Sequence, residues 1–268
     1  MTSPQAHVAD GIAAADAPIT ITVRDGVALV TLNRPAKRNA LNDGLIHALR
    51  DFFTAVPAGV KVAVIHGSGE CFSAGLDLSE LTDQSIAGGI RHSRLWHKAF
   101  EAIEFGDVPV ISALHGAVVG GGLELAASTH IRVADATAYF ALPEGQRGIF
   151  VGGGGSVRLP RLIGVHRMTD MMLTGRVLEA QDAQAIGLVQ YVVEPGAAVD
   201  HALGLAARIA NNAPLTNFAV VHALPRAAQA APEHGLMLEA LMAAIAQGDD
   251  LAKERLNAFL AKRAPKVR

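Results

Sequence analysis

One stretch decides the fold prediction for this chain: Gly120-Gly121-Gly122-Leu123-Glu124-Leu125-Ala126-Ala127. Three glycines lead into a run of helix-forming residues, and a carboxylate lies in the first turn of that run. Glycine lets the backbone turn sharply and leaves its N–H groups open to a ligand, and the first N–H donors of a helix are unpaired. Such a segment suits an anion or a developing oxyanion, with Glu124 placed to exchange a proton beside it. The same pattern also fits an ordinary tight turn, so other segments are needed to distinguish a catalytic role from a structural one.

Two loop segments elsewhere in the chain favour the catalytic interpretation. The first, residues 71–78, is made largely of small residues and follows Val60–His66, an apolar run with the composition of a strand. Loops at the ends of buried strands are where α/β proteins place their ligands. The second, residues 142–148, follows the short strand candidate Ala138–Ala141 and places Glu144 just after a proline.

The two glutamates are 20 positions apart (144 − 124), and another strand candidate, His130–Ala134, lies between them. A helix, a strand and a hairpin return would bring both carboxylates to one cavity. Each glutamate alone also fits a solvated charge at a helix start or in a loop. Together, in this arrangement, they favour an acid–base pair.

The rest of the chain indicates an α/β fold, because strand and helix patterns alternate. The expected elements are a hairpin of strands 19–23 and 27–32 with Asp25-Gly26 at its turn, a helix from Asn42 or Asp43 to about Thr54, a strand at 60–66, a helix near 89–105, a strand at 109–114, and a helix from the glycines to about Ser128. From Ala197 onward only helical patterns occur, interrupted by proline and glycine.

Composition bounds the class of protein. A chain of 268 residues, half of them hydrophobic, can bury one large core with a small appendage. A formal net charge of −2 gives no bulk attraction to nucleic acid or anionic membrane. One cysteine excludes an internal disulfide and fits a reducing compartment. Residues 1–18 lack the cationic start and apolar stretch of a signal peptide, so we expect a loose tail and a cytoplasmic protein.

Taken together, the motifs resemble those of the crotonase (enoyl-CoA hydratase/isomerase) superfamily, and most closely those of enoyl-CoA hydratases. The segments that carry the resemblance follow one another in family order from about residue 19 to the C-terminus. They are Leu32–Leu41, Phe72–Leu78, Gly120–Ala126, Leu142–Glu144, Gly153–Leu159, Leu173–Arg176, Ala185–Val189 and Phe259–Arg263. Any one of them is a weak signal, whereas their order and spacing are highly specific.

The resemblance implies an α/β fold of the crotonase type, a spiral of ββα turns followed by a C-terminal helical trimerisation region. It divides the chain into a flexible tail (1–18), a spiral core with the active site (19–196) and a helical region for oligomerisation (197–268). No internal sequence repeat shows the spiral independently. A homotrimer or a dimer of trimers is therefore expected.

The resemblance also implies the chemistry. In the family, the thioester carbonyl of an acyl-CoA lies between two backbone N–H donors, which by motif are those of Leu76 and Gly121. Fixed donors stabilise the enolate-like charge on that oxygen. By the same resemblance, Glu124 helps to activate water and Glu144 is the main proton donor. The implied reaction is hydration of a trans-2-enoyl-CoA, without a separate cofactor.

Relatives with other reactions remain as alternatives. Double-bond isomerases of the superfamily commonly need only the carboxylate at the Glu144 position, and hydroxycinnamoyl-CoA hydratase-lyases tend to lack the one at Glu124, so the pair favours a hydratase. Leu142 and Val151 depart from the usual short-chain hydratase pattern. Together with Phe150 they leave the acyl group open, including aromatic or branched chains. A non-catalytic acyl-CoA-binding or RNA-associating scaffold is the alternative from another class.

Binding of CoA and of the acyl group is assigned to further positions by resemblance. Lys37 or Arg38 would lie near the phosphates, and Lys262 or Arg263 would reach the CoA of a neighbouring subunit; each also fits a solvated charge. Arg34 is expected to serve the structure instead. The complete set expected to bind substrate is Lys37, Arg38, Ala40, Ala74, Gly75, Asp77, Leu78, Gly120, Pro143, Phe150 and Lys262.

Other site types are not supported by the sequence. The glycine run Gly152–Gly155 is not followed by Gly-Lys-Ser/Thr, so it is not a P-loop. His92 and His97 are five positions apart and poorly placed for one helix face, and no His/Cys cluster occurs, so we predict no metal. With two tyrosines and one tryptophan, the chain offers no aromatic platform for single-stranded nucleic acid.

Overall fold

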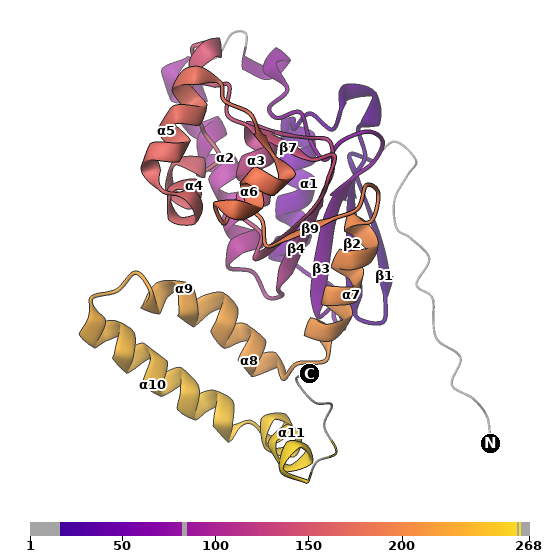
Figure 1. Cartoon of the computed structure of the whole chain (residues 1–268), viewed down its shortest axis with the longest axis vertical. Helices are drawn as coiled ribbons and strands as arrows, with labels where there is room; N and C mark the ends of the chain where they lie inside the picture. The colour runs from indigo at the N-terminus through magenta and orange to yellow at the C-terminus, as the bar shows by residue number, and fades with distance from the viewer. Residues whose placement is uncertain (1–16, 82–84, 262, 264–268) are drawn as a thin grey trace, which may run out of the picture. The chain divides into compact units, whose positions relative to one another are not determined.

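The structure, a computed structural model, describes residues 17–81, 85–261 and 263 (Figure 1). The chain divides into two compact units, residues 1–207 and 208–268, with the division inside helix α7 (Ala198–Ala210). The first unit has the mixed α/β architecture expected from the alternating patterns. The three-part division inferred from the sequence stays a prediction.

A six-stranded sheet forms the frame of the first unit, and Figure 1 shows β1 to β4 lying side by side in it. Its spatial order is β1 (Ile19–Arg24), β2 (Val27–Leu32), β3 (Val62–Gly67), β4 (Val110–Leu114), β6 (Ile131–Asp135) and β9 (Tyr191–Val193). The β1–β2 pair is antiparallel, and every later pair is parallel. The predicted hairpin is confirmed: Asp25 and Gly26 have positive φ angles of 52° and 78°, as a tight Asp-Gly turn requires.

A smaller sheet of three strands carries the segments around the two glutamates. It consists of β5 (Ala117–Val119), β7 (Tyr139–Ala141) and β8 (Leu178–Glu179), with β5 and β7 parallel and β7 and β8 antiparallel. The expected hairpin return is wrong, because β6 and β7 belong to different sheets. The β5–β7 pairing, extended by the bond from Gly120 N–H to the carbonyl of Ala141 (2.9 Å), brings the segment of Glu144 beside the glycine run.

The helices of the first unit pack against these sheets or against one another. They are α1 (Asp43–Thr54), α2 (Ile86–Glu104), α3 (Gly121–Ala127), α4 (Gly155–Ile163), α5 (Val165–Thr174), α6 (Ala180–Ala185) and α7, with 3-10 turns η1 (Pro35–Lys37), η2 (Leu78–Leu81) and η3 (Gly145–Arg147). The predicted cap of the first helix is confirmed, since the Asn42 side chain accepts from Leu45 N–H at 3.0 Å. Among the described helices, none combines the length and the apolar character needed to cross a membrane.

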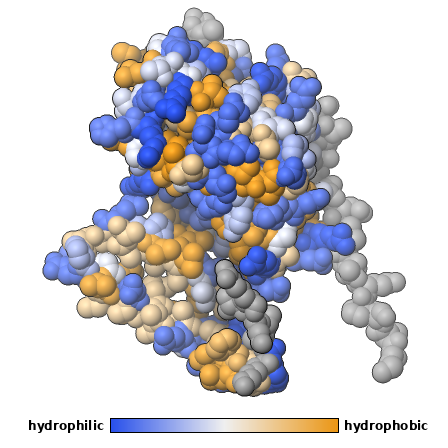
Figure 2. All heavy atoms as spheres, in the orientation of Figure 1, coloured by the Kyte–Doolittle hydropathy of each residue, from blue (hydrophilic) through white to orange (hydrophobic). Residues whose placement is uncertain are grey.

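The described residues of the second unit form helices joined by turns, and no strand, as predicted. It contains α8 (Pro214–Phe218), the π-helical turn η4 (Ala219–Ala223), α9 (Leu224–Ala227), α10 (Pro232–Gly248) and α11 (Asp250–Leu260). Many of its large apolar side chains are exposed, among them Leu236, Met237 and Leu241 of α10. Figure 2 shows apolar residues spread over the visible face of α8 to α10.

Candidate active site

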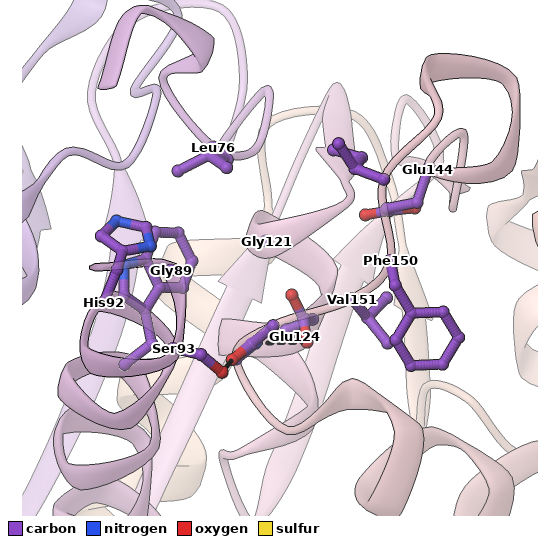
Figure 3. Close-up of a pocket in the computed structure, with 13 residues that line it drawn as sticks. Leu76, Gly89, His92, Ser93, Gly121, Glu124, Glu144, Phe150 and Val151 are labelled. Atoms are coloured by element: carbon purple, nitrogen blue, oxygen red, sulfur yellow. Dashed lines mark hydrogen bonds between the residues drawn. The ribbon is translucent and has the colours of Figure 1, made fainter. Parts of the chain in front are cut away.

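A cavity of about 370 Å³ opens in the first unit (Figure 3). One wall is a face of α2, and the opposite wall is the loop of residues 149–153. Leu76, Gly121, Glu124 and Glu144 complete the lining. The structure therefore brings together all four residues predicted to take part in catalysis, together with Phe150. In Figure 3 both carboxylates point into the space between Leu76 and the loop that carries Phe150.

The N–H groups of Leu76 and Gly121 come from two backbone segments that are packed tightly together. Leu76 is held by an isolated parallel bridge to Leu41. A Cβ added to Gly121 would lie 3.4 Å from the nitrogen of Leu76, and a Cβ added to Gly75 would lie 3.5 Å from the nitrogen of Gly121. Within the described part of the chain, neither N–H has an acceptor. The cavity wall thus contains two neighbouring donors ready to bind an oxygen.

Glycine is required at position 120. Its φ and ψ are 52° and −122°, a region that residues with a Cβ rarely adopt. A Cβ there would also lie 2.7 Å from Oε1 of Glu144. The glycine run thereby lets the Glu144 carboxylate lie against the backbone that leads into α3.

Glu124 is almost completely buried, and backbone N–H groups donate hydrogen bonds to its carboxylate. Its Oε1 accepts hydrogen bonds from the N–H groups of Gly153 and Gly155, each at 2.8 Å. A Cβ on Gly155 would lie 2.8 Å from that oxygen, so only glycine allows this approach. Burial raises the pKa of Glu124, while these hydrogen bonds and the charge of Arg158 oppose the rise.

Glu144 is also buried, but no other described residue donates a backbone N–H to its carboxylate. It immediately precedes η3, and its main-chain carbonyl accepts from Arg147 and Ile149. Its Oε2 is buried and has no hydrogen-bond partner among the described residues. Burial raises the pKa of Glu144 to about 7, and the negative charge of Glu124 adds to the rise. A carboxyl with such a pKa can hold or release a proton at neutral pH.

The other residues predicted to bind substrate lie outside the lining of this cavity. Lys37 and Arg38 are exposed, and Arg38 donates to the Tyr139 hydroxyl at 3.2 Å. Arg34 has the expected structural role, because it donates to the Ala40 carbonyl and pairs with Asp77 at 3.1 Å.

Gly75 and Gly120 support the backbone of the site, as described above. Ala74 donates through its N–H to the Arg38 carbonyl, Pro143 accepts from Gln146 N–H, and Leu78 is exposed. Lys262 lies outside the described residues.

Residues that the sequence interpretation missed form the α2 wall. His92, Ser93 and Trp96 line the cavity at the spacing of one helix face. Ser93 Oγ donates to the Gly152 carbonyl at 2.6 Å and so joins this wall to the opposite loop. The glycine run Gly152–Gly155, which was rejected above as a phosphate loop, binds the Glu124 carboxylate. The only sequence signal for this contact was the run of glycines itself. It indicates that another group lies close to the backbone, but it does not identify that group.

His92 also belongs to a polar cluster at the start of α1. Its Nε2 lies 3.1 Å from Oδ1 of Asp43, and Oε2 of Glu80 accepts from the Asp43 N–H at 2.9 Å. One ligand-type atom from each of these three side chains lies within 4.8 Å of the others. Glu80 and His92 both contact Asp43, the first residue of α1. The expectation that no metal binds stays a prediction.

Comparison with known proteins matches the chain to one family. The family model described as enoyl-CoA hydratase/isomerase matches residues 22–268. The chain is 35% identical to the 2,3-dehydroadipyl-CoA hydratase of Escherichia coli (strain K12) over 251 residues, which cover 92% of this chain and 97% of that protein. It is 34% identical to the crotonyl-CoA hydratase of Syntrophomonas wolfei over 249 residues, covering 91% and 95%.

Solved structures agree with the sequence comparison. A crystal structure of an enoyl-CoA hydratase candidate from Rhodopseudomonas palustris CGA009 is 58% identical, with a TM-score of 0.89 over 92% of this chain and 95% of that one. The enoyl-CoA hydratase of Bacillus anthracis is 32% identical, with a TM-score of 0.86 over 93% and 98%.

Proposed function

Because the chain belongs to the enoyl-CoA hydratase/isomerase family and is a hydro-lyase of the enoyl-CoA hydratase type, we propose that it hydrates a trans-2-enoyl-CoA to the 3-hydroxyacyl-CoA. One observation carries the proposal: a single cavity is lined by two buried carboxylates and by two backbone donors that have no acceptor among the described residues. Hydration of a conjugated thioester needs these parts and no redox group. The reaction as proposed uses no separate cofactor.

The backbone donors stabilise the charge that develops on the thioester oxygen. Addition of water at Cβ shifts electron density through Cα to the carbonyl, which becomes enolate-like. In the proposed complex this oxygen lies between the N–H groups of Leu76 and Gly121. One fixed donor of this kind contributes about 3–4 kcal/mol to stabilisation of a transition state. The side chain of Leu76 has no part in this role.

The two carboxylates divide the proton transfers. Glu124 deprotonates the water, whose oxygen forms a bond to Cβ, and Glu144 gives its proton to Cα. Two N–H groups support the ionised form of Glu124, whereas Glu144 has a pKa raised to about 7 and lacks such donors. On the basis of these donors, we assign the single proton shared by the pair to Glu144. After the reaction Glu124 carries the proton taken from water and Glu144 is ionised, so the next turnover requires a proton transfer from Glu124 to Glu144, either directly or through solvent.

The first test follows loss of the conjugated enoyl absorbance with a panel of substrates. Crotonyl-CoA and cinnamoyl-CoA are offered to the wild type and to the double variant Glu124→Gln/Glu144→Gln. We expect hydration of crotonyl-CoA by the wild type and none by the double variant. Turnover of the aromatic thioester alone would keep the chemistry and assign an aromatic acyl group.

The same assay separates the alternatives. A 3-enoyl-CoA converted to the conjugated 2-enoyl isomer, without formation of a hydroxyacyl product, would identify an isomerase. Cleavage of a hydroxycinnamoyl thioester to an aldehyde would identify a hydratase-lyase. Binding of CoA esters without turnover of any of them would contradict the enzymatic proposal and leave the scaffold role.

Lys37 and Arg38 are tested by charge removal, which should raise KM without changing kcat.

We further propose that the second unit mediates self-association as a homotrimer or a dimer of trimers. The support is the exposed apolar surface of α10, where Leu236, Met237, Leu241 and Ile245 are each at least half exposed. Apolar surface on this scale marks an interaction site. Light scattering of the wild type should give a trimer or hexamer mass, and Leu241→Glu should shift it toward the monomer. A monomeric wild type at tens of micromolar would contradict the proposal.

A further inference from the structure

We propose that Trp96 is a positioning residue for the hydration: its indole ring fixes both the Gly121 donor and the backbone that binds Glu124. The inference rests on the proposed function, because it concerns the same cavity and the same reacting groups. Trp96 is the only tryptophan of the chain, is 3% exposed, and lies on the face of α2 that lines the cavity.

The first contact is with the oxyanion-binding segment. A Cβ built on Gly121 would lie 2.7 Å from Cζ3 and 3.0 Å from Cη2 of Trp96, well inside van der Waals contact. The benzo edge of the indole therefore covers the open face of the Gly121 backbone. Because glycine is the residue least restricted in φ and ψ, the ring limits how far this peptide can rotate. The N–H direction of Gly121 is thereby held toward the cavity.

The second contact is with the loop that binds Glu124. A Cβ built on Gly153 would lie 3.2 Å from Cε3 of Trp96 and 2.8 Å from Cε2 of Phe100. Gly153 N–H donates to Oε1 of Glu124 at 2.8 Å. The same ring thus contacts the peptide that stabilises the oxyanion and the peptide that orients the water-activating carboxylate. Atoms of Trp96 are among the three nearest to the added Cβ at both glycines.

The ring itself is rigidly placed. Phe100, one helical turn further along α2, packs edge-on against it with ring centroids 5.6 Å apart and planes at 68°. The indole Nε1 is buried and has no partner among the described residues. The role of Trp96 in the unliganded protein is therefore one of shape, and a smaller apolar side chain cannot reproduce it because the benzo edge would be missing. Misplacement of a donor or a catalytic carboxylate by about 1 Å can cost about 10²-fold in rate.

The test compares the wild type with Trp96→Phe and Trp96→Leu, using crotonyl-CoA turnover and the infrared carbonyl stretch of bound butyryl-CoA. Butyryl-CoA has no double bond to hydrate, so the carbonyl band reports on the oxyanion donors alone. Donors polarise the carbonyl and lower its stretching frequency. For Trp96→Leu we expect kcat to fall roughly 30- to 100-fold with KM changed less than about threefold. The band should move back toward the frequency of free butyryl-CoA, and Trp96→Phe should fall between the two.

Phe53→Leu is the matched control. Phe53 is a fully enclosed aromatic residue of α1 that packs on Phe52 and does not line the cavity. It should lower the melting temperature about as much as Trp96→Leu and leave kcat and the carbonyl band unchanged. Equal loss of kcat in both variants, or an unshifted band in Trp96→Leu, would overturn the proposal. If the wild type hydrates no enoyl-CoA, the proposed function fails, whereas the butyryl-CoA band still decides whether Trp96 positions Gly121.

Discussion

Glu124 and Glu144 line one cavity, yet the chain surrounds them in opposite ways. Glu124 lies on α3 and accepts two backbone N–H bonds from the glycine run at the start of α4. Glu144 lies in the turn after β7, with one carboxylate oxygen against the Cα of Gly120 and the other buried without a partner among the described residues. Both carboxyls are buried and both pKa values are raised, but backbone N–H groups support the ionised form of Glu124 and oppose the rise there. The predictions below alter one side of this contrast at a time.

The largest effect is expected from removing the proton donor. Glu144→Gln keeps the shape of the side chain but cannot give a proton to Cα, so kcat for crotonyl-CoA should fall about 10³-fold with KM little changed. Steady-state kinetics measures both constants. Glu101→Gln, which removes an exposed carboxyl of α2, is the control and should keep wild-type rates. A Glu144→Gln enzyme with more than a tenth of wild-type kcat would remove Glu144 from the mechanism.

The pH profile of the wild type adds a check on the same pair. Hydration neither releases nor takes up a proton overall, so kcat/KM must depend on pH identically for hydration and dehydration. The active form carries one proton on the pair, and both profiles should fall above pH 7 as Glu144, with its pKa of about 7, ionises. A kcat/KM that does not fall above pH 7 would show that the ionisation of Glu144 does not control the reaction.

The contrast between the two carboxyl environments marks the limit of what the sequence predicts. Three features can be recognised from neighbouring residues alone: the glycine run, the small-residue loop at 71–78 and the two glutamates. The structure brings them to one cavity. The Gly152–Gly155 run binds Glu124, which lies 29 residues before Gly153 and 31 before Gly155. No local pattern identifies so distant a partner. The α2 wall was missed because helical periodicity identifies the buried face without showing whether it meets core or cavity.

The hairpin expected between β6 and β7 failed for a related reason. Two short strand patterns separated by a few residues favour a hairpin when only local spacing is considered. In the structure Ala138 N–H bonds to the Asp135 carbonyl, and Tyr139 N–H bonds to the distant Gly116 carbonyl. Long-range pairing of β7 with β5 therefore overrides the local preference. That pairing is also what places Glu144 beside Gly120.

A second prediction concerns the stability that Glu144 costs the fold. Below its ordinary pKa of 4.5 the carboxyl is protonated in both the folded and unfolded states, so it contributes nothing. Between pH 4.5 and about 7 only the unfolded state releases the proton, and stability falls as pH rises. Above about pH 7 the full penalty, about 3 kcal/mol, persists. Relative to the wild type, the free energy of unfolding of Glu144→Gln should therefore rise by up to that amount as the pH increases from 4.5 to about 7.

Urea unfolding of both proteins at one fixed concentration, from pH 5 to 8, measures this difference. Only its change with pH is diagnostic, because the buried amide of the variant adds a cost that does not depend on pH. A difference that stays constant from pH 5 to 8 would show that the Glu144 carboxyl titrates near its ordinary value.

A smaller loss is expected from disturbing the Glu124 side of the contrast without touching its carboxyl. In Gly155→Ala the new Cβ would lie 2.8 Å from both Cγ and Oε1 of Glu124, so the side chain or the loop must shift. We expect kcat to fall roughly tenfold, because the carboxylate loses its alignment with the attacking water. Gly204→Ala in α7, where a Cβ meets nothing within 4 Å, is the control. It should keep kcat and gain about 0.5–1 kcal/mol of stability. Unchanged kcat in Gly155→Ala would show that the backbone donors of Gly153 and Gly155 do not orient Glu124.

The smallest expected effect tests how far the two environments depend on each other. Burial is the main cause of the raised pKa of Glu144, and the charge of Glu124 is a lesser one. Glu124→Gln removes that charge but leaves the burial, so the pKa of Glu144 should drop by less than about one unit and stay above 4.5. The titration is measured by carbon-13 NMR of the glutamate side-chain carboxyls, with the Glu144→Gln protein used to assign the resonance. A fall to 4.5 or below would mean that the charge of Glu124, and not desolvation, holds the proton on Glu144. The asymmetry of the pair would then arise from mutual repulsion, and the two roles could be exchanged by moving the backbone donors from one carboxylate to the other.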